Sequence, residues 1–145
     1  MNLSQMLRGY DLFHSLPPEE VEAISSFSAP KSFAKDEVVY KDEASASHVF
    51  VLLRGEVQLR INATAGERGI VAVKVGNGEI FGIAPILGEP RYTATAKCLV
   101  PCDVLAVEAK PLRAVLARNP VAAAAVMAAV SRAYYTRYME LLGRS

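Results

Sequence analysis

The 145-residue sequence has no tryptophan, only two cysteines and two histidines, and no long apolar run. Its longest apolar stretch, residues 121–130 (VAAAAVMAAV), falls well short of the roughly 18 residues that a membrane-spanning helix needs. The opening MNLSQMLRGYDLF lacks the basic segment followed by an apolar segment that marks a secretory signal. We therefore expect a soluble cytoplasmic protein with no membrane partner.

The few cysteines and histidines also argue against a metal site. Zinc takes four ligands, and His14, His48, Cys98 and Cys102 form no recognisable set. If Cys98 and Cys102 share one strand, they lie about 13 Å apart on one face, too far for a disulfide. We predict neither a metal nor a disulfide.

Motifs of catalysis are missing as well. The sequence has no GxSxG, no phosphate-binding P-loop, no HExxH and no convincing Ser/His/Asp set. We therefore predict that the chain is not an enzyme and has no catalytic residues.

Charge is nearly balanced overall, at +1, but unevenly spread. Residues 1–50 hold four basic and eight acidic residues, whereas residues 110–145 hold six basic residues and only Glu140. A basic tail can bind nucleic acid, but it more often forms a solvated helix face. Nucleic-acid binding is thus the least favoured of the functions considered.

The periodicity of the chain divides it into three parts within one domain. Residues 1–28 are predicted to be helical, with Asp11 or Ser15 as a cap and with Pro17 and Pro18 near the first turn of the second helix. Residues 29–109 are predicted to form short antiparallel strands, and residues 110–145 two further helices. The predicted fold class is mainly β with flanking helices (α+β): an antiparallel β-roll or double-stranded jelly roll with N-terminal helices and a long C-terminal helix.

Several local signals define the predicted strands. Residues 48–53 form an apolar strand, and Val57, Leu59 and Ile61 alternate with polar residues. The ATAGERG segment is predicted to be a hairpin loop, Asn77-Gly78 a tight turn, and the chain around Pro101 two short strands.

Two signals define the C-terminal helices. Asn119-Pro120 is expected to end a short helix, and Gly143 a long one. On the long helix, one apolar stripe is predicted, to pack against the roll or against a second copy of the helix. It is made of these residues: Val126, Val130, Tyr134, Tyr138 and Leu141.

This order of elements resembles the cyclic nucleotide-binding domain superfamily, which includes the catabolite activator protein. The similarity covers nearly the whole chain, through LFHSLPPEEVEAISSF, the segment from FAKDEVVY to LLRGEVQL, VGNGEIFG, and the segment from TATAKC to LARNP. The resemblance implies a ligand loop at residues 81–95. In the family this loop reads FGE, a short helical turn, then Arg followed by Ser or Thr and Ala.

The ligand chemistry of that loop depends on two side chains. The arginine pairs with the cyclic phosphate, and the glutamate accepts a hydrogen bond from the ribose hydroxyl. Here Phe81 and Gly82 match, but Ile83 replaces the glutamate and cannot accept. Pro85 also removes one N–H donor from the helical turn.

The position of the arginine has two interpretations. An ungapped count places Tyr92 there, followed by Thr93 and Ala94, and it agrees with the register from the following strand. A one-residue shift would instead place Arg91 on the phosphate. The ungapped count is the simpler one, so we expect Arg91 to point near the pocket and not into it. The implied ligand-binding residues are Phe81, Gly82, Ile83, Arg91, Tyr92, Thr93 and Ala94.

Three functions follow from the resemblance. The first is a ligand-dependent regulatory or sensor domain with a degenerate ligand loop, for a small anion or nucleotide. The second is a dimerisation or protein-interaction module with no ligand, its pocket filled by Ile83 and Tyr92. The third is genuine binding of cyclic AMP or cyclic GMP through Arg91, in which case a cyclic nucleotide is the only cofactor.

Partners are inferred from the long helix. Tyr134, Tyr135 and Tyr138 could stack on a purine, but packing against the roll or a second copy is favoured, so we expect a homodimer. The sequence stops at Ser145, which leaves no room for the DNA-binding domain of some relatives. We expect output to a protein effector that the sequence does not identify, or a chain that is one domain of a longer protein.

Overall fold

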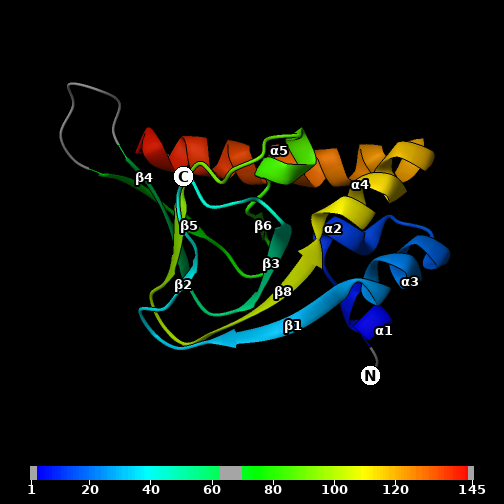
Figure 1. Ribbon diagram of the computed structural model, residues 1–145, viewed down its shortest axis with the longest axis horizontal. Helices are drawn as coiled ribbons and strands as arrows, with labels where there is room; N and C mark the ends of the chain where they lie inside the picture. Colours follow the sequence, from blue (N-terminus) through cyan, green and yellow to red (C-terminus); the bar gives the residue numbers. More distant parts are fainter. Residues whose placement is uncertain (1–2, 63–69, 144–145) are drawn as a thin grey trace.

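Two four-stranded antiparallel sheets, flanked by helices, make up the architecture of the computed structural model, which describes residues 3–62 and 70–143 (Figure 1). This confirms the predicted fold class. The helices are α1 (Leu3–Leu7), α2 (Asp11–His14) and α3 (Pro18–Ser26) before the sheets, and α4 (Ala109–Arg118) and α5 (Pro120–Leu141) after them.

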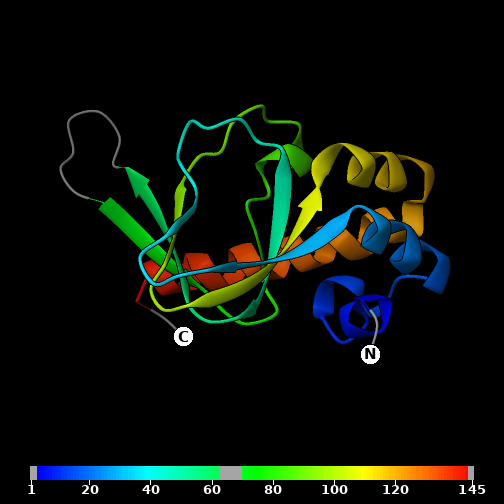
Figure 2. The same ribbon diagram turned by 60° about the horizontal axis from the view of Figure 1, so that its bottom comes forward.

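The sheets have the strand orders β1-β8-β3-β6 and β2-β7-β4-β5. In Figure 2 the antiparallel strands β1 and β8 extend between the roll and the helices at the other end of the molecule; β8 runs toward the helices and β1 away from them. The predicted hairpin loop ATAGERG lies outside the described residues, between two strands that pair as a hairpin. The strands are β1 (Ser28–Phe33), β2 (Val38–Tyr40), β3 (His48–Arg54), β4 (Val57–Asn62), β5 (Ile70–Val75), β6 (Ile80–Phe81), β7 (Thr95–Cys98) and β8 (Cys102–Glu108).

Strand β3 separates two hydrophobic cores. Val49 and Val51 pack with the helices, whereas Phe50 and Leu52 face the interior of the roll. Successive side chains of a strand point to opposite faces, so a strand buried on both faces reads as a continuous apolar run. The apolar run at residues 48–53 therefore contributes side chains to both cores.

The local turn and cap signals are mostly confirmed. Glu79 N donates to Gly76 O at 3.0 Å, which closes a turn around Asn77-Gly78, with Gly78 at a φ of +85°. Asn119 Oδ1 accepts from the N–H of Ala122 at 3.0 Å and caps α5. The cap predicted at Ser15 is wrong, because Pro17 precedes α3 and no side chain caps that helix.

Helix α5 extends along both the N-terminal helices and the roll (Figure 1). Of the predicted stripe, Val126 and Val130 are buried in the chain, whereas Tyr134, Tyr138 and Leu141 are 48%, 59% and 50% exposed. The buried positions follow the spacing four, three, four, which is one face of a helix of 3.6 residues per turn. These buried residues are Val126, Val130, Ala133 and Arg137, joined by Ala122 and Ala129. No helix in the described part of the chain could span a membrane.

Cys98 and Cys102 lie at the end of β7 and the start of β8, which belong to different sheets. The assumption that they share one strand is wrong, so the separation of about 13 Å does not apply. Both thiols are free and buried. Burial and the neighbouring Cys102 thiol raise the pKa of Cys98 to about 12, so Cys98 is a neutral thiol at ordinary pH.

Gly55→Ala is expected to lower the free energy of unfolding by about 3 kcal/mol. Gly55 has a φ of +125°, and an added Cβ would lie 2.6 Å from Cys102 Sγ and 2.9 Å from the Pro101 carbonyl oxygen. Gly88→Ala is the matched control, since Gly88 has a φ of +82° but no neighbour within 4 Å of an added Cβ. Strain alone costs about 1 kcal/mol there. Urea unfolding measures both, and equal losses would contradict the predicted clash.

Candidate functional site

The backbone of the predicted ligand loop is built around a short helical turn. Strand β6 ends at Phe81, and the 3-10 helix η1 (Ala84–Leu87) follows. Gly82 and Gly88 flank it, both in the left-handed region with φ of +65° and +82°. An added Cβ at Gly82 would lie 2.9 Å from the Phe50 ring, so the loop requires glycine there.

Tyr92 occupies the interior of the roll. The residue is 4% exposed, and its ring stacks on that of Tyr40 with centroids 4.0 Å apart. Its hydroxyl donates to His48 O at 2.6 Å and accepts from His48 N at 3.1 Å. Tyr92 is thus fixed at both ends, by ring stacking and by a pair of hydrogen bonds to β3.

Arg91, in contrast, points out of the roll. It is exposed, and its Nη1 donates to Glu43 O at 2.8 Å. Its backbone forms an isolated bridge with Ser45. The structure therefore places Tyr92 at the cavity and Arg91 on the adjoining surface.

Of the other predicted site residues, all but Phe81 line the cavity beside Tyr92. Phe81 is fully buried, and Ile83 and Ala94 are 5% and 9% exposed. Ile83, Ala94 and the exposed Thr93 line a cavity beside Tyr92, as does Gly82. Phe81 instead packs against Phe50, with ring centroids 5.4 Å apart.

The cavity that remains inside the roll is small, about 80 Å³. Pockets that enclose a nucleotide-sized ligand have volumes on the order of 300–1,000 Å³. Four buried rings stack on one another in the roll interior: Tyr40, Phe50, Phe81 and Tyr92.

Arg137 of α5 also lines this cavity, and the sequence did not single it out. It is only 5% exposed, and its Nη2 donates to Ile80 O. Its Nε is buried and has no hydrogen-bond partner among the described residues. Burial lowers the pKa of Arg137 from its ordinary value, although an arginine remains charged at neutral pH.

The nearest acidic side chains make hydrogen bonds elsewhere. Glu79 and Glu140 act on Arg137 electrostatically, but neither is within ion-pair distance in the described structure. Glu79 Oε1 accepts from Gly76 N at 2.5 Å, and Glu140 Oε2 accepts from Lys74 N at 3.1 Å. The guanidinium of Arg137 therefore has no direct counter-ion among the described residues.

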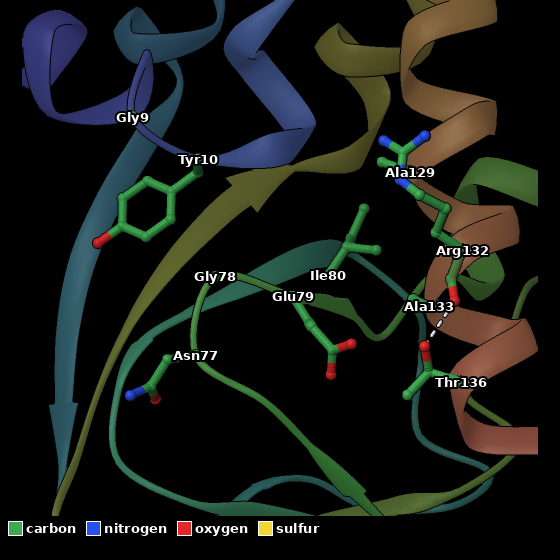
Figure 3. Close-up of a pocket in the computed structure, with 10 residues that line it drawn as sticks. All are labelled: Gly9, Tyr10, Asn77, Gly78, Glu79, Ile80, Ala129, Arg132, Ala133 and Thr136. Carbon is green, nitrogen blue, oxygen red and sulfur yellow. Dashed lines mark hydrogen bonds between the residues drawn. The ribbon is translucent and has the colours of Figure 1, made fainter. Parts of the chain in front are cut away.

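Two larger hollows lie outside the roll, along α5. Figure 3 shows Tyr10 on one side of the first, Arg132 and Thr136 on the other, and Glu79 between them. Its volume is about 530 Å³, and that of its neighbour about 620 Å³. Thr136 Oγ1 donates to Arg132 O at 3.1 Å, and Glu79 Oε1 accepts from Gly76 N at 2.5 Å, so these two side chains already have partners.

The two antiparallel sheets form a β-roll. A helical turn flanked by glycines precedes β7, and a long helix packs against the roll; together these features define the class of fold. The chain belongs to the cyclic nucleotide-binding domain family, whose model matches residues 30–119. The predicted resemblance is thereby confirmed.

Individual relatives agree with this assignment. The cyclic AMP receptor protein of Thermus thermophilus is 25% identical over 135 residues, which are 93% of this chain and 62% of that protein. A crystal structure from Geobacter metallireducens GS-15, whose name assigns it to cyclic nucleotide binding, has a TM-score of 0.81 at 28% identity, covering 95% of this chain and 99% of that one. The sensor domain of the transcriptional regulator DNR from Pseudomonas aeruginosa has a TM-score of 0.75 at 23% identity, covering 94% and 96%.

Tyr40→Phe is expected to weaken the loss of stability at alkaline pH. Burial raises the pKa of Tyr40 above its ordinary value of 10.0, so the folded hydroxyl keeps its proton where the unfolded one releases it. The unfolded state then binds fewer protons, and the free energy of unfolding falls as the pH rises above about 10. Urea unfolding between about pH 8 and pH 11 measures this fall.

Tyr138→Phe is the control, because it removes a hydroxyl from an exposed ring. Tyr92 remains in the Tyr40→Phe variant, and burial raises its pKa too, so the fall is reduced and not abolished. An alkaline fall of the same size in Tyr40→Phe and in the wild type would contradict the prediction.

Proposed function

We propose that this chain is a regulatory domain, not an enzyme, in which the roll excludes cyclic nucleotides and α5 is the output element. The observation that carries this proposal is Tyr92. It lies inside the roll in stacking contact with Tyr40, while Arg91 is exposed and bonded to Glu43.

Two physical requirements for a cyclic nucleotide are unmet at the loop. The cyclic phosphate needs a cation, and the loop's arginine donates to a backbone oxygen outside the roll. The ribose hydroxyl needs an acceptor, and the Ile83 side chain has none. A ligand that loses both hydrogen bonds on burial would bind weakly.

Binding through Arg91 would require a large rearrangement. Tyr92 would have to leave Tyr40 and both hydrogen bonds to His48, and Arg91 would have to leave Glu43. The main chain opposes this exchange as well. Tyr92 N donates to Ala44 O, and Glu43 N donates to Tyr92 O, both at 2.9 Å.

Contacts from the roll to the C-terminal helices support an output role for those helices. Arg113 Nη1 of α4 donates to Pro85 O of η1 at 3.0 Å. Arg137 of α5 donates to Ile80 O, immediately before the loop. A change in the loop would therefore shift hydrogen bonds of both helices.

Exposed apolar side chains on α5 and just after it support self-association, which we expect to be the form of that output. These large side chains are 37% to 65% exposed. Exposed contiguous apolar patches commonly mark interaction sites. The residues concerned are Met127, Tyr134, Tyr135, Tyr138, Leu141 and Leu142.

Neither cyclic AMP nor cyclic GMP is expected to raise the unfolding midpoint of the chain. A ligand at about 100 times its dissociation constant would add about 2.7 kcal/mol to stability, which thermal unfolding detects readily. The companion variant Tyr92→Ala opens the roll and tests whether the ring is the obstacle. A saturable midpoint shift in the wild type, abolished by Arg91→Met, would overturn the proposal in favour of a cyclic nucleotide sensor.

Tyr135→Glu with Tyr138→Glu is expected to convert an associated chain to monomers. The two charges would have to be desolvated in an apolar contact. Ala29→Glu is the control, since it adds charge at an exposed position of β1 away from α5 (Figure 1). Sedimentation equilibrium measures mass directly. A wild type that is monomeric up to about 1 mM would contradict self-association through α5.

A further inference from the structure

The buried charge of Arg137 is the least explained feature of the roll. A buried guanidinium is costly unless a counter-charge and hydrogen-bond acceptors compensate for its lost hydration. Arg137 has an acceptor in Ile80 O, but its Nε has none among the described residues, and no described carboxylate is within ion-pair distance. An acceptor of opposite charge would complete this site.

The cavity of about 80 Å³ lies beside this guanidinium. Three tyrosines line it together with Arg137: Tyr40 and Tyr92, which are buried, and Tyr134 of α5, which is half exposed. The hydroxyl of Tyr92 is already bonded to His48, so Tyr40 and Tyr134 are the tyrosines considered as donors. Phenolic hydroxyls and guanidinium N–H groups are all hydrogen-bond donors. Ile83 and Ala94, which also line the cavity, have apolar side chains.

We propose that this cavity is a binding site for a small planar oxyanion or carboxylate, held by the guanidinium of Arg137 with the hydroxyls of Tyr40 and Tyr134 as further donors. The planar fork of an arginine matches the geometry of carboxylate-like groups. The anion would supply the missing counter-charge and the acceptor for Nε.

The size of the cavity sets the class of ligand. A water molecule has a share of about 30 Å³ in the liquid, so 80 Å³ holds the equivalent of two to three waters. Anions of three or four heavy atoms, such as formate, nitrate or acetate, have this size. A nucleoside phosphate does not fit without displacing Tyr92.

This inference goes beyond the proposed function and rests on it in one respect, that α5 is the output element. An anion bound to Arg137 would bridge α5 to the roll, and its concentration would set how firmly the helix is held. Binding itself can be measured whether or not the chain associates, so the two proposals can fail separately.

The direct test is proton–nitrogen NMR of the arginine Nε–H groups, titrated with sodium nitrate, sodium formate and sodium acetate. Sodium chloride at matched ionic strength is the reference, because it offers charge without planar acceptors. We expect the Arg137 Nε–H resonance to shift saturably with at least one planar anion and not with chloride. The Arg91 resonance, from an exposed side chain, is the internal control.

Variants test the same assignment by thermal unfolding. Arg137→Met is expected to abolish the anion-dependent rise in midpoint, and Arg137→Lys to weaken anion affinity at least tenfold, since an ammonium lacks the planar fork. Arg91→Met is the matched control and is expected to keep the full response. Without anion, Arg137→Met is expected to unfold at the same or a higher temperature, because an uncompensated buried charge has been removed.

Two outcomes would overturn the proposal. One is an Arg137 Nε–H resonance in the wild type that no planar anion shifts beyond the effect of chloride. The other is an anion response of equal size in Arg137→Met and wild type. The NMR result needs no variant, so it decides the question even if Arg137→Met fails to fold.

Discussion

The stacking of Tyr92 on Tyr40 determines what the interior of the roll can contain. The two rings lie 4.0 Å apart, and Tyr40 continues into contacts with Phe50 and Phe81. The hydroxyl of Tyr92 is also hydrogen-bonded to the backbone N and O of His48 in β3. The stacked rings are therefore anchored to the strand that both cores share. The cavity that remains in the roll is small, and the side chains that line it determine its polarity and charge.

Helix α5 supplies the polar part of that edge. Most of its buried face is small or aliphatic and packs against the helical core, but one turn beyond Ala133 the same face brings Arg137 to the roll. A single helix thus packs a hydrophobic core along one half and presents a buried cation along the other. Since a helix moves as a rigid element over such distances, the environment of Arg137 is linked to the position of the whole helix.

The sequence predicted the fold where the signals are local. The alternation of Val57 and Leu59 with polar residues, the Asn77-Gly78 turn and the Asn119 cap each specify their structure over a few residues. Strand β1 was not predicted, because Pro30 and exposed side chains give no alternation. It exists through pairing with β8, as an edge strand where proline is tolerated.

The site was predictable only in its backbone and in Tyr92. An ungapped count placed Tyr92 at the cavity, and the structure has it there. Arg137 was missed because the neighbouring tyrosines gave a more hydrophobic stripe, so a charged residue seemed to belong on the solvent side. The spacing of Val126, Val130 and Ala133 continues to Arg137, and this was the one signal that could have found it. The glycine-flanked turn is thus present. The two positions to which the family resemblance assigns ligand selection carry Ile83 and Tyr92, and the cation that lines the cavity comes from α5.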